Sequence, residues 1–209
     1  MILVIGGGVI GAAVARVAAR TGAVMVGSLT PRPHVGLWFR FDLTKDTIPA
    51  GLPPDARIIV AVGGAEPGAV RALAASTTRP VTVILPATAP RIPGTACVRA
   101  SPAWDLHERS LQPVLDAMRQ GRTGRLPRGL PPRRWIWAED VARAALDAGR
   151  GEDLALCGPV LLDGDAVRTA LAARERGTCG VNVFRTLTVA PDPERDDWDD
   201  VRWGQRRRL

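Results

Sequence analysis

The first 28 residues contain a strand, a glycine turn, a helix and a second strand in immediate succession. Residues 2–5 (ILVI) are a continuous apolar run, which is typical of a strand buried on both faces of a parallel sheet. Three glycines follow at 6–8, then an expected helix at 9–21 and a second apolar strand at 24–27. Because a helix between two strands returns the chain to its starting edge, the strands must be parallel. This opening restricts the chain to an α/β fold.

The alternation of strands and helices continues through most of the chain. We expect further strands at 39–43, 57–62, 81–85 and 97–100, a partly extended stretch at 155–162 and an alternating strand at 181–189. We expect further helices at 66–76, 108–120, 139–148 and 164–176. Strands that alternate with helices build a parallel sheet with helices on its faces. The pattern predicts a Rossmann-like, doubly wound α/β fold with a small C-terminal region.

Gly6, Gly8 and Gly11 form a G-x-G-x-x-G pattern between the first strand and the first helix. In such a turn the first glycine permits the tight bend, the second lets the backbone approach a diphosphate, and the third lets the helix pack closely on the strand. Free amide groups at the amino end of the helix then face the phosphates. Because the pattern follows a strand and opens a helix, it predicts a dinucleotide-binding site.

The end of the second strand bears on which dinucleotide is bound. A carboxylate there commonly binds the ribose hydroxyl of NAD, but this chain has GSLTPR at 27–32. The side chains of Ser28, Thr30 and Arg32 suit the 2′-phosphate of NADP better than the free 2′-hydroxyl of NAD. Alternatively, these residues form an ordinary polar turn that binds no ligand. We therefore expect NADP as the cofactor, with NAD as the alternative.

Six short stretches, in this order, resemble the extended or atypical short-chain dehydrogenase/reductase superfamily, the NAD-dependent epimerase/dehydratase group. They are IGGGVIG (5–11), FDLT (41–44), VAVGG (60–64), VRASPAWD (98–105), RWIWAEDVARAAL (134–146) and GPVLLDGDAVRTAL (158–171). The resemblance covers most of residues 1–175 and implies that Asp42 lies near the adenine. The chain departs from the family pattern at Ile5, which replaces a glycine, and at Trp137, which replaces a histidine.

One element of that family is missing from the sequence. Family members that carry out redox chemistry have Tyr-x-x-x-Lys on the helix after the fifth strand, where Tyr is the general acid/base and Lys lowers its pKa. This chain has no tyrosine, and its single lysine is Lys45. Residues 86–96 (PATAPRIPGTA) are too short and too rich in proline to form that helix.

The loss of this helix has consequences for both chemistry and packing. Any hydride transfer must use another proton donor or none. We expect the sheet face that the helix normally covers to be covered by the tail, a partner subunit or the tryptophan-rich segments. Any homodimer is expected to use a different surface, because the missing helix commonly helps to build the family dimer.

Replacement proton donors are expected beyond the carboxyl ends of the strands. Thr88 follows the fifth strand, near the place of the family's Ser or Thr, and Asp105 and His107 follow the sixth. His107 is the natural acid/base at neutral pH, and Asp105 is placed to orient it. Each also has a structural reading: Thr88 as a turn residue, Asp105 as a helix N-cap and His107 as a solvated side chain. We take all three as catalytic candidates.

The composition limits the classes of ligand and partner that this chain is expected to bind. The net charge of +7 is carried almost wholly by arginine, which indicates a GC-rich bacterial genome, and six arginines lie in 119–134. That segment is either an anion clamp or a solvated loop, and the lack of aromatic residues before Trp135 argues against nucleic acid. Three cysteines and two histidines suggest no metal site and suit a reducing cytoplasm. The opening apolar stretch ends at Arg16, too early to span a membrane.

These observations predict one Rossmann-like domain at 1–190, in which 1–101 bind the dinucleotide and 102–190 face a small-molecule substrate, followed by a charged tail at 191–209. The predicted function is that of a truncated epimerase/dehydratase-like NAD(P)-binding enzyme in specialised metabolism. It is either a reductase with a substituted acid or a non-redox isomerase or cyclase. The alternative is a non-catalytic dinucleotide sensor or scaffold subunit, which the loss of the tyrosine helix favours.

Overall fold

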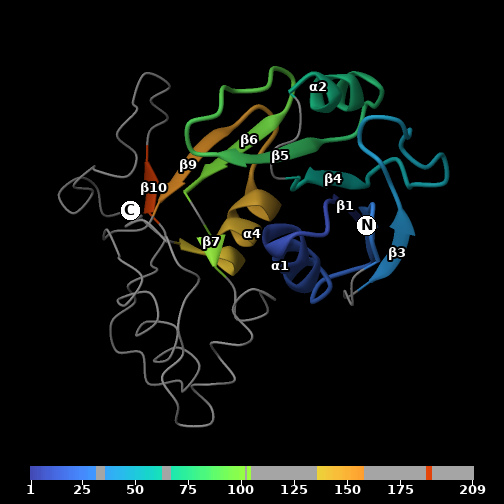
Figure 1. The fold of residues 1–209 in the computed structure, drawn as a ribbon, viewed down its shortest axis with the longest axis horizontal. Helices are drawn as coiled ribbons and strands as arrows, with labels where there is room; N and C mark the ends of the chain where they lie inside the picture. The colour runs from blue at the N-terminus through green and yellow to red at the C-terminus, as the bar shows by residue number, and fades with distance from the viewer. Residues whose placement is uncertain (32–35, 63–66, 102, 105–135, 158–186, 190–209) are drawn as a thin grey trace, which may run out of the picture.

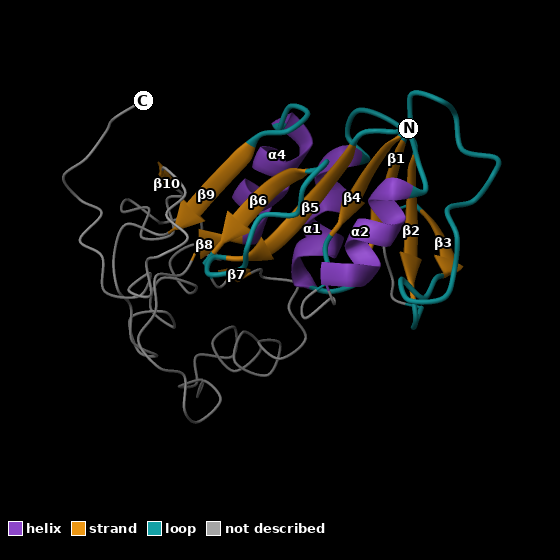
Figure 2. Ribbon diagram, turned by 90° about the horizontal axis from the view of Figure 1, so that it is seen from above, coloured by secondary structure: helices purple, strands orange, loops and turns teal. Residues whose placement is uncertain are grey.

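The computed structural model describes residues 1–31, 36–62, 67–101, 103–104, 136–157 and 187–189. Most of its strands form one eight-stranded sheet of order β10-β9-β6-β5-β4-β1-β2-β3 (Figures 1 and 2). These strands are β1 (Ile2–Ile5), β2 (Val24–Ser28), β3 (Leu37–Arg40), β4 (Arg57–Val60), β5 (Val81–Pro86), β6 (Ala96–Ala100), β9 (Asp153–Cys157) and β10 (Leu187–Val189). Neighbouring strands are parallel except β10, which runs antiparallel to β9. The predicted Rossmann-like fold is confirmed.

The strand order reverses direction beside β1. The chain moves outward from β1 to β2 and β3, and then returns to place β4 on the other side of β1. In open parallel sheets, the crevice beyond the carboxyl ends of two such strands is where ligands bind. The glycine turn lies at this point, directly after β1.

Helices cover both faces of the sheet (Figure 1). One face packs against α1 (Val9–Ala18) and α4 (Ala138–Asp147), which share a core cluster with inward residues of β1, β2, β4, β5, β6 and β9. The opposite face packs against α2 (Pro67–Ala75), whose Val70 and Leu73 are buried. Small alanines dominate the buried sides of α1 and α4, and this allows the two helices to lie close together.

The connection between β5 and β6 contains no helix. All of residues 87–95 are described, and they form turns and irregular backbone. Ile92, from the middle of this loop, is buried in the core cluster of the α2 face together with Val81, Val83 and Cys97. The predicted deletion of the helix is confirmed. Ile92 of the loop therefore covers part of this face. Further cover by the tail, a partner subunit or the tryptophan-rich segments stays a prediction, because the tail lies outside the described residues.

The observed bounds differ from the predicted ones at several elements: α1 ends at Ala18 instead of 21, β9 covers Asp153–Cys157 instead of 155–162, and β3 begins at Leu37 instead of 39. Gly36, with φ +103°, lies against the Val24 carbonyl and brings the chain into register at Leu37. Because β3 is an edge strand, Leu37 is 65% exposed, and the apolar alternation was a poor guide to its start. A second, two-stranded sheet of β7 (Ala103–Trp104) and β8 (Ile136–Trp137) was not predicted.

Several predictions fall outside the described residues. These are the helices at 108–120 and 164–176, most of the strand at 181–189, and the charged tail at 191–209. Among the helices of the described ranges, none combines the length and the apolar character needed to cross a bilayer.

Candidate functional site

The glycine turn has a backbone path that side chains would block at two positions. Gly6 has φ +118°, and its amide donates a hydrogen bond of 2.8 Å to the Gly27 carbonyl of β2. A Cβ on Gly6 would overlap the carbonyl oxygen of Ala61, just beyond β4, and a Cβ on Gly11 would overlap the carbonyl oxygen of Gly6. These two glycines therefore allow β1, β4 and α1 to approach one another at the switch point.

Gly8 stands in a different environment. It is the N-cap of α1, its backbone is extended, and no side chain caps the helix there. A Cβ added at Gly8 would meet no heavy atom of the described residues within 4 Å. The first turn of α1 carries no acidic residue, and Gly8 is exposed, so among the described residues no negative side chain caps the amide groups of this turn. This exposed helix start fits the diphosphate of a dinucleotide, which would accept hydrogen bonds from these amides.

The Ser28 hydroxyl at the end of β2 is already engaged. It donates a 2.9 Å hydrogen bond to the Thr30 carbonyl and accepts one of 2.9 Å from Trp38 Nε1 on β3. A serine hydroxyl has one proton to donate, so in this geometry Ser28 has none left for a phosphate. The arrangement instead fixes the backbone of the Thr30 turn. Arg32 lies outside the described residues.

Arg40 is a residue that sequence reasoning missed. It is paired in register with Ser28, so the two side chains lie on the same face of the sheet, and Arg40 is exposed. Among the described residues it has no hydrogen-bond or ion-pair partner. The expected start of β3 at residue 39 concealed this pairing, and a start at 37 would have revealed it.

Asp42 follows β3 and organises its own turn. Its Oδ1 accepts hydrogen bonds from the amide and the hydroxyl of Thr44, at 3.0 and 2.7 Å, and Lys45 Nζ lies 3.6 Å from Oδ2. The Thr44 hydroxyl and amide, helped by the Lys45 charge, hold the pKa of Asp42 below its usual value. The carboxylate is therefore ionised at neutral pH and holds the turn that leads away from β3.

Of the three catalytic candidates, only Thr88 lies among the described residues. Thr88 is exposed in a turn directly after β5, on the carboxyl edge of the sheet, as predicted. Asp105 and His107 lie outside the described residues. Trp137, which replaces the family's histidine, is buried at the start of α4, and Trp135 is outside the described residues. Within the described ranges, no three metal-ligating side chains come together.

A buried ion pair lies on the sheet face left by the missing helix. Arg99 on β6 is only 2% exposed, and its Nε and Nη2 donate to the two carboxylate oxygens of Asp153 on β9 at 3.1 and 3.0 Å. Next to it, Arg91 of the loop donates to the Gly151 carbonyl at 2.7 Å. Polar groups thus join β6, β9 and the loop where a helix would supply apolar contacts. The sequence offered no signal for this pair, because its two residues lie far apart along the chain.

Glu139 joins the two helices of the other face. Its carboxylate lies 2.8 Å from Arg20, just after α1, and 3.2 Å from Arg143 within α4. Burial raises the pKa of Glu139, but hydrogen bonds and charges from Arg143 and Arg20 outweigh this effect and bring it below 4.5. Glu139 and Asp140 lie in the first turn of α4, where negative charge interacts favourably with the helix dipole.

Comparisons with known proteins agree with this architecture. No protein-family model matches the sequence, and the curated proteins include no match. Among solved structures, UDP-N-acetylglucosamine 4-epimerase from Bacillus cereus is similar over 85% of this chain and 82% of its own, with a TM-score of 0.60 and 10% identity.

Two further solved structures share the fold. Human epimerase family protein SDR39U1, solved with NADPH, is similar over 83% of this chain and 79% of its own, with a TM-score of 0.52 and 19% identity. The enzyme WbmH from Bordetella bronchiseptica, solved with NAD+, is similar over 92% and 83%, with a TM-score of 0.54 and 11% identity. The chain therefore has the fold of NAD-dependent epimerase/dehydratase structures, and the resemblance seen in the sequence is confirmed for the fold.

Proposed function

We propose that this chain binds a nicotinamide dinucleotide at the glycine turn, with NADP preferred over NAD, and acts on a small organic molecule without a tyrosine–lysine pair. The observation that carries the proposal is the open helix start at Gly8 beside the crowded glycines Gly6 and Gly11. The two crowded positions serve the fold. Packing within the described residues does not require glycine at the open position, Gly8. The close approach of a diphosphate to the backbone would explain why glycine stands there.

The described residues supply the binding part of this function. Amides at the start of α1 would hold the diphosphate, and the turn after β2, fixed through Ser28 and Trp38, would hold the adenosine ribose. Thr30, Arg32 and Arg40 would recognise a 2′-phosphate, since Ser28 has committed its proton. Asp42 would lie on the adenine side. A bound nicotinamide ring accepts or donates a hydride.

The chemical part of the function rests on residues beyond the carboxyl ends of β5 and β6. Thr88 would hydrogen-bond a substrate oxygen, and His107, oriented by Asp105, would hold or release a proton. Because the chain has no tyrosine, no phenol can do so. The reaction is then either a reduction with this substituted acid or a non-redox isomerisation or cyclisation on the same scaffold.

Dinucleotide binding is tested by titrating the purified full chain with NADPH and NADH while following tryptophan fluorescence. Trp38 donates to Ser28 near the expected ribose, so a bound dinucleotide is expected to quench its fluorescence. We expect saturable binding that is tighter for NADPH. Gly8→Ala should weaken it by about tenfold or more, equivalent to at least about 1.4 kcal/mol, because the added methyl occupies the space of a phosphate.

Gly22→Ala is the matched control. Like Gly8, Gly22 has no heavy atom within 4 Å of an added Cβ, but it lies beyond the far end of α1. The control should bind NADPH like the unchanged protein. Equal loss of binding in both variants, or no binding of either dinucleotide at millimolar concentration, would contradict the proposal.

A second candidate function is a non-catalytic dinucleotide sensor or scaffold subunit. The absent tyrosine and the helix-free β5–β6 connection favour it. The two functions separate when NADPH oxidation is followed with a panel of carbonyl compounds and UDP-sugars, together with product analysis for isomerisation. Turnover that is lost in Thr88→Ala or His107→Ala supports the enzyme. Tight binding without any turnover supports the sensor.

A further inference from the structure

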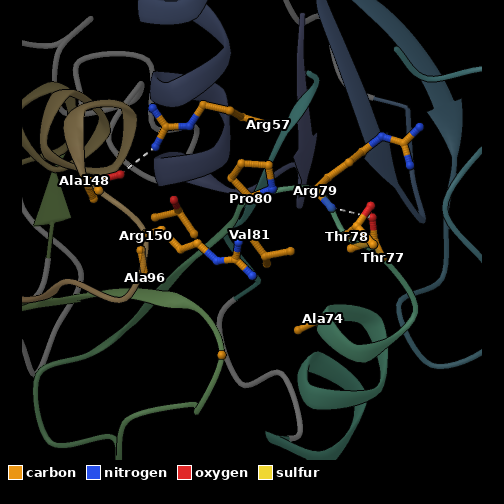
Figure 3. Close-up of a pocket in the computed structure, with 13 residues that line it drawn as sticks. Arg57, Ala74, Thr77, Thr78, Arg79, Pro80, Val81, Ala96, Ala148 and Arg150 are labelled. Carbon is orange, nitrogen blue, oxygen red and sulfur yellow. Dashed lines mark hydrogen bonds between the residues drawn. The ribbon is translucent and has the colours of Figure 1, made fainter. Parts of the chain in front are cut away.

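A cavity of about 220 Å³ opens at the amino edge of the sheet, opposite the glycine turn (Figure 3). The residues that line it come from the starts of β4, β5 and β6, the segment after α2 and the segment after α4. Its polar lining consists of three arginines and three threonines, with no acidic residue among them. The polar residues are Arg57, Thr77, Thr78, Arg79, Thr82 and Arg150.

The arginines lining the cavity carry charge that no carboxylate balances. Arg57 donates to the carbonyls of Leu146 and Ala148 at the end of α4, and Arg79 donates to those of Leu52 and Pro53. Carbonyl oxygens fix these two guanidinium groups in place without neutralising them. Across the described part of the chain, neither they nor Arg150 form an ion pair.

Arg150 is the arginine available to a ligand. Its side chain is exposed and has no hydrogen-bond partner among the described residues. Figure 3 shows its guanidinium beside Val81, within the ring of lining residues, while that of Arg57 turns toward Ala148. The neighbouring carboxylate of Glu152 accepts a hydrogen bond from the Gly149 amide, at 2.8 Å.

Thr82 supplies an independent indication of a ligand. It lines the same cavity and is only 2% exposed, and within the described ranges its hydroxyl has no hydrogen-bond partner. A buried hydroxyl is almost always satisfied by protein, water or a bound group. Because Thr82 lines the cavity, a group bound in the cavity lies close to this residue.

We propose that this cavity is a binding site for a phosphate dianion, either the free ion or the phosphate of a small monoester. Guanidinium groups held in fixed positions are the donors that best match phosphate oxygens. The Arg150 side chain would bind the anion directly, Arg57 and Arg79 would supply positive potential, and Thr82 would donate its hydroxyl proton. The volume admits a phosphate with a small organic group, but not a dinucleotide. The site is separate from the proposed cofactor site, because it lies at the opposite ends of the strands.

The test is a titration of the full chain with inorganic phosphate, followed by calorimetry at constant ionic strength, with chloride as the reference anion. We expect saturable binding that Arg150→Gln weakens by about tenfold or more. Arg71→Gln is the matched control, since Arg71 is exposed on α2, has no partner among the described residues and does not line the cavity. It should bind phosphate like the unchanged protein.

Thr82→Val gives a second measure that does not depend on surface charge. The change removes the buried hydroxyl and keeps the shape, so phosphate binding should weaken while stability without phosphate stays equal or rises. Phenyl phosphate, titrated in parallel, distinguishes the sources: tighter binding than phosphate identifies a monoester, and weaker binding identifies the free ion. The proposal is overturned if Arg150→Gln and Arg71→Gln lose affinity equally, if phosphate binds no better than chloride, or if NADPH displaces the phosphate by competition.

Discussion

The β1–β2 and β5–β6 connections join neighbouring parallel strands of the same sheet in different ways. The first contains the glycine turn and α1, which packs on the sheet with Ala13, Val14 and Ala18 fully buried. The second crosses back through residues 87–95 without a helix and buries a single large side chain from the loop, Ile92. The sheet continues in regular parallel register on both sides of this loop.

The comparison shows that a helix is not required to return a chain between parallel strands. A strand of five or six residues is about 17–20 Å long, and an extended loop of the length of 87–95 spans more than that. The loop supplies fewer apolar contacts to the sheet than a helix would. Polar contacts hold this region instead: Arg99 pairs with Asp153, and the Thr95 hydroxyl donates to the Ile92 carbonyl at 2.8 Å. One connection thus contains the glycine turn that we propose binds a dinucleotide, and the other contains no helix.

The largest effect is expected at the glycine turn. Gly6→Val places a β-branched side chain at φ +118° and against the Ala61 carbonyl. We expect the free energy of unfolding to fall by about 4 kcal/mol or more, since strain and overlap add. Urea denaturation followed by circular dichroism measures it. A change below about 1 kcal/mol would mean that the first crossover tolerates rearrangement.

The next largest effect concerns the ion pair beneath the helix-free connection. Asp153→Asn leaves the Arg99 guanidinium buried without its counter-charge, and we expect a loss of about 3 kcal/mol in unfolding free energy. The double variant Arg99→Met with Asp153→Leu should recover most of that loss. If the single variant unfolds like the original protein, the pair does not hold this face together.

The loop's own apolar contribution is expected to be smaller. Ile92→Ala removes a buried side chain from the α2-face core, and we expect a loss of about 2 kcal/mol because an irregular loop can partly close the cavity. Leu37→Ala on the exposed edge strand is the control, with an expected change below about 0.5 kcal/mol. Equal effects at the two positions would show that the loop does not seal the face.

The smallest effect is a pH dependence on the α1–α4 side. The folded pKa of Glu139 is below its ordinary value of 4.5, so its contribution is present above pH 4.5 and is lost as the pH falls through the folded pKa. We expect about 0.5 kcal/mol, because the pair with Arg20 is partly exposed. Comparing the stability of Glu139→Gln with that of the unchanged protein between about pH 3 and pH 6 measures this contribution. Parallel stability curves would exclude the contribution.

The features that could be predicted from the sequence are those whose residues lie close together along the chain. The first crossover has its whole signal within residues 2–28, because strand, glycines and helix are consecutive. The missing helix was predictable from three prolines in a short connection. By contrast, Arg99 meets Asp153, and Arg57 meets the end of α4, only through the arrangement of the sheet. The engagement of Ser28 by Trp38 depended on the register of an edge strand whose start the sequence misplaced.

A crystal structure of the full chain grown with NADPH tests the central claim most directly. We predict a diphosphate bound to the backbone amides at the start of α1, directly over Gly8, and a 2′-phosphate beside the turn after β2. The β5–β6 connection should remain without a helix, and no tyrosine can stand near the nicotinamide. A dinucleotide bound elsewhere, or a Gly8 turn filled by the protein's own side chains, would contradict the account.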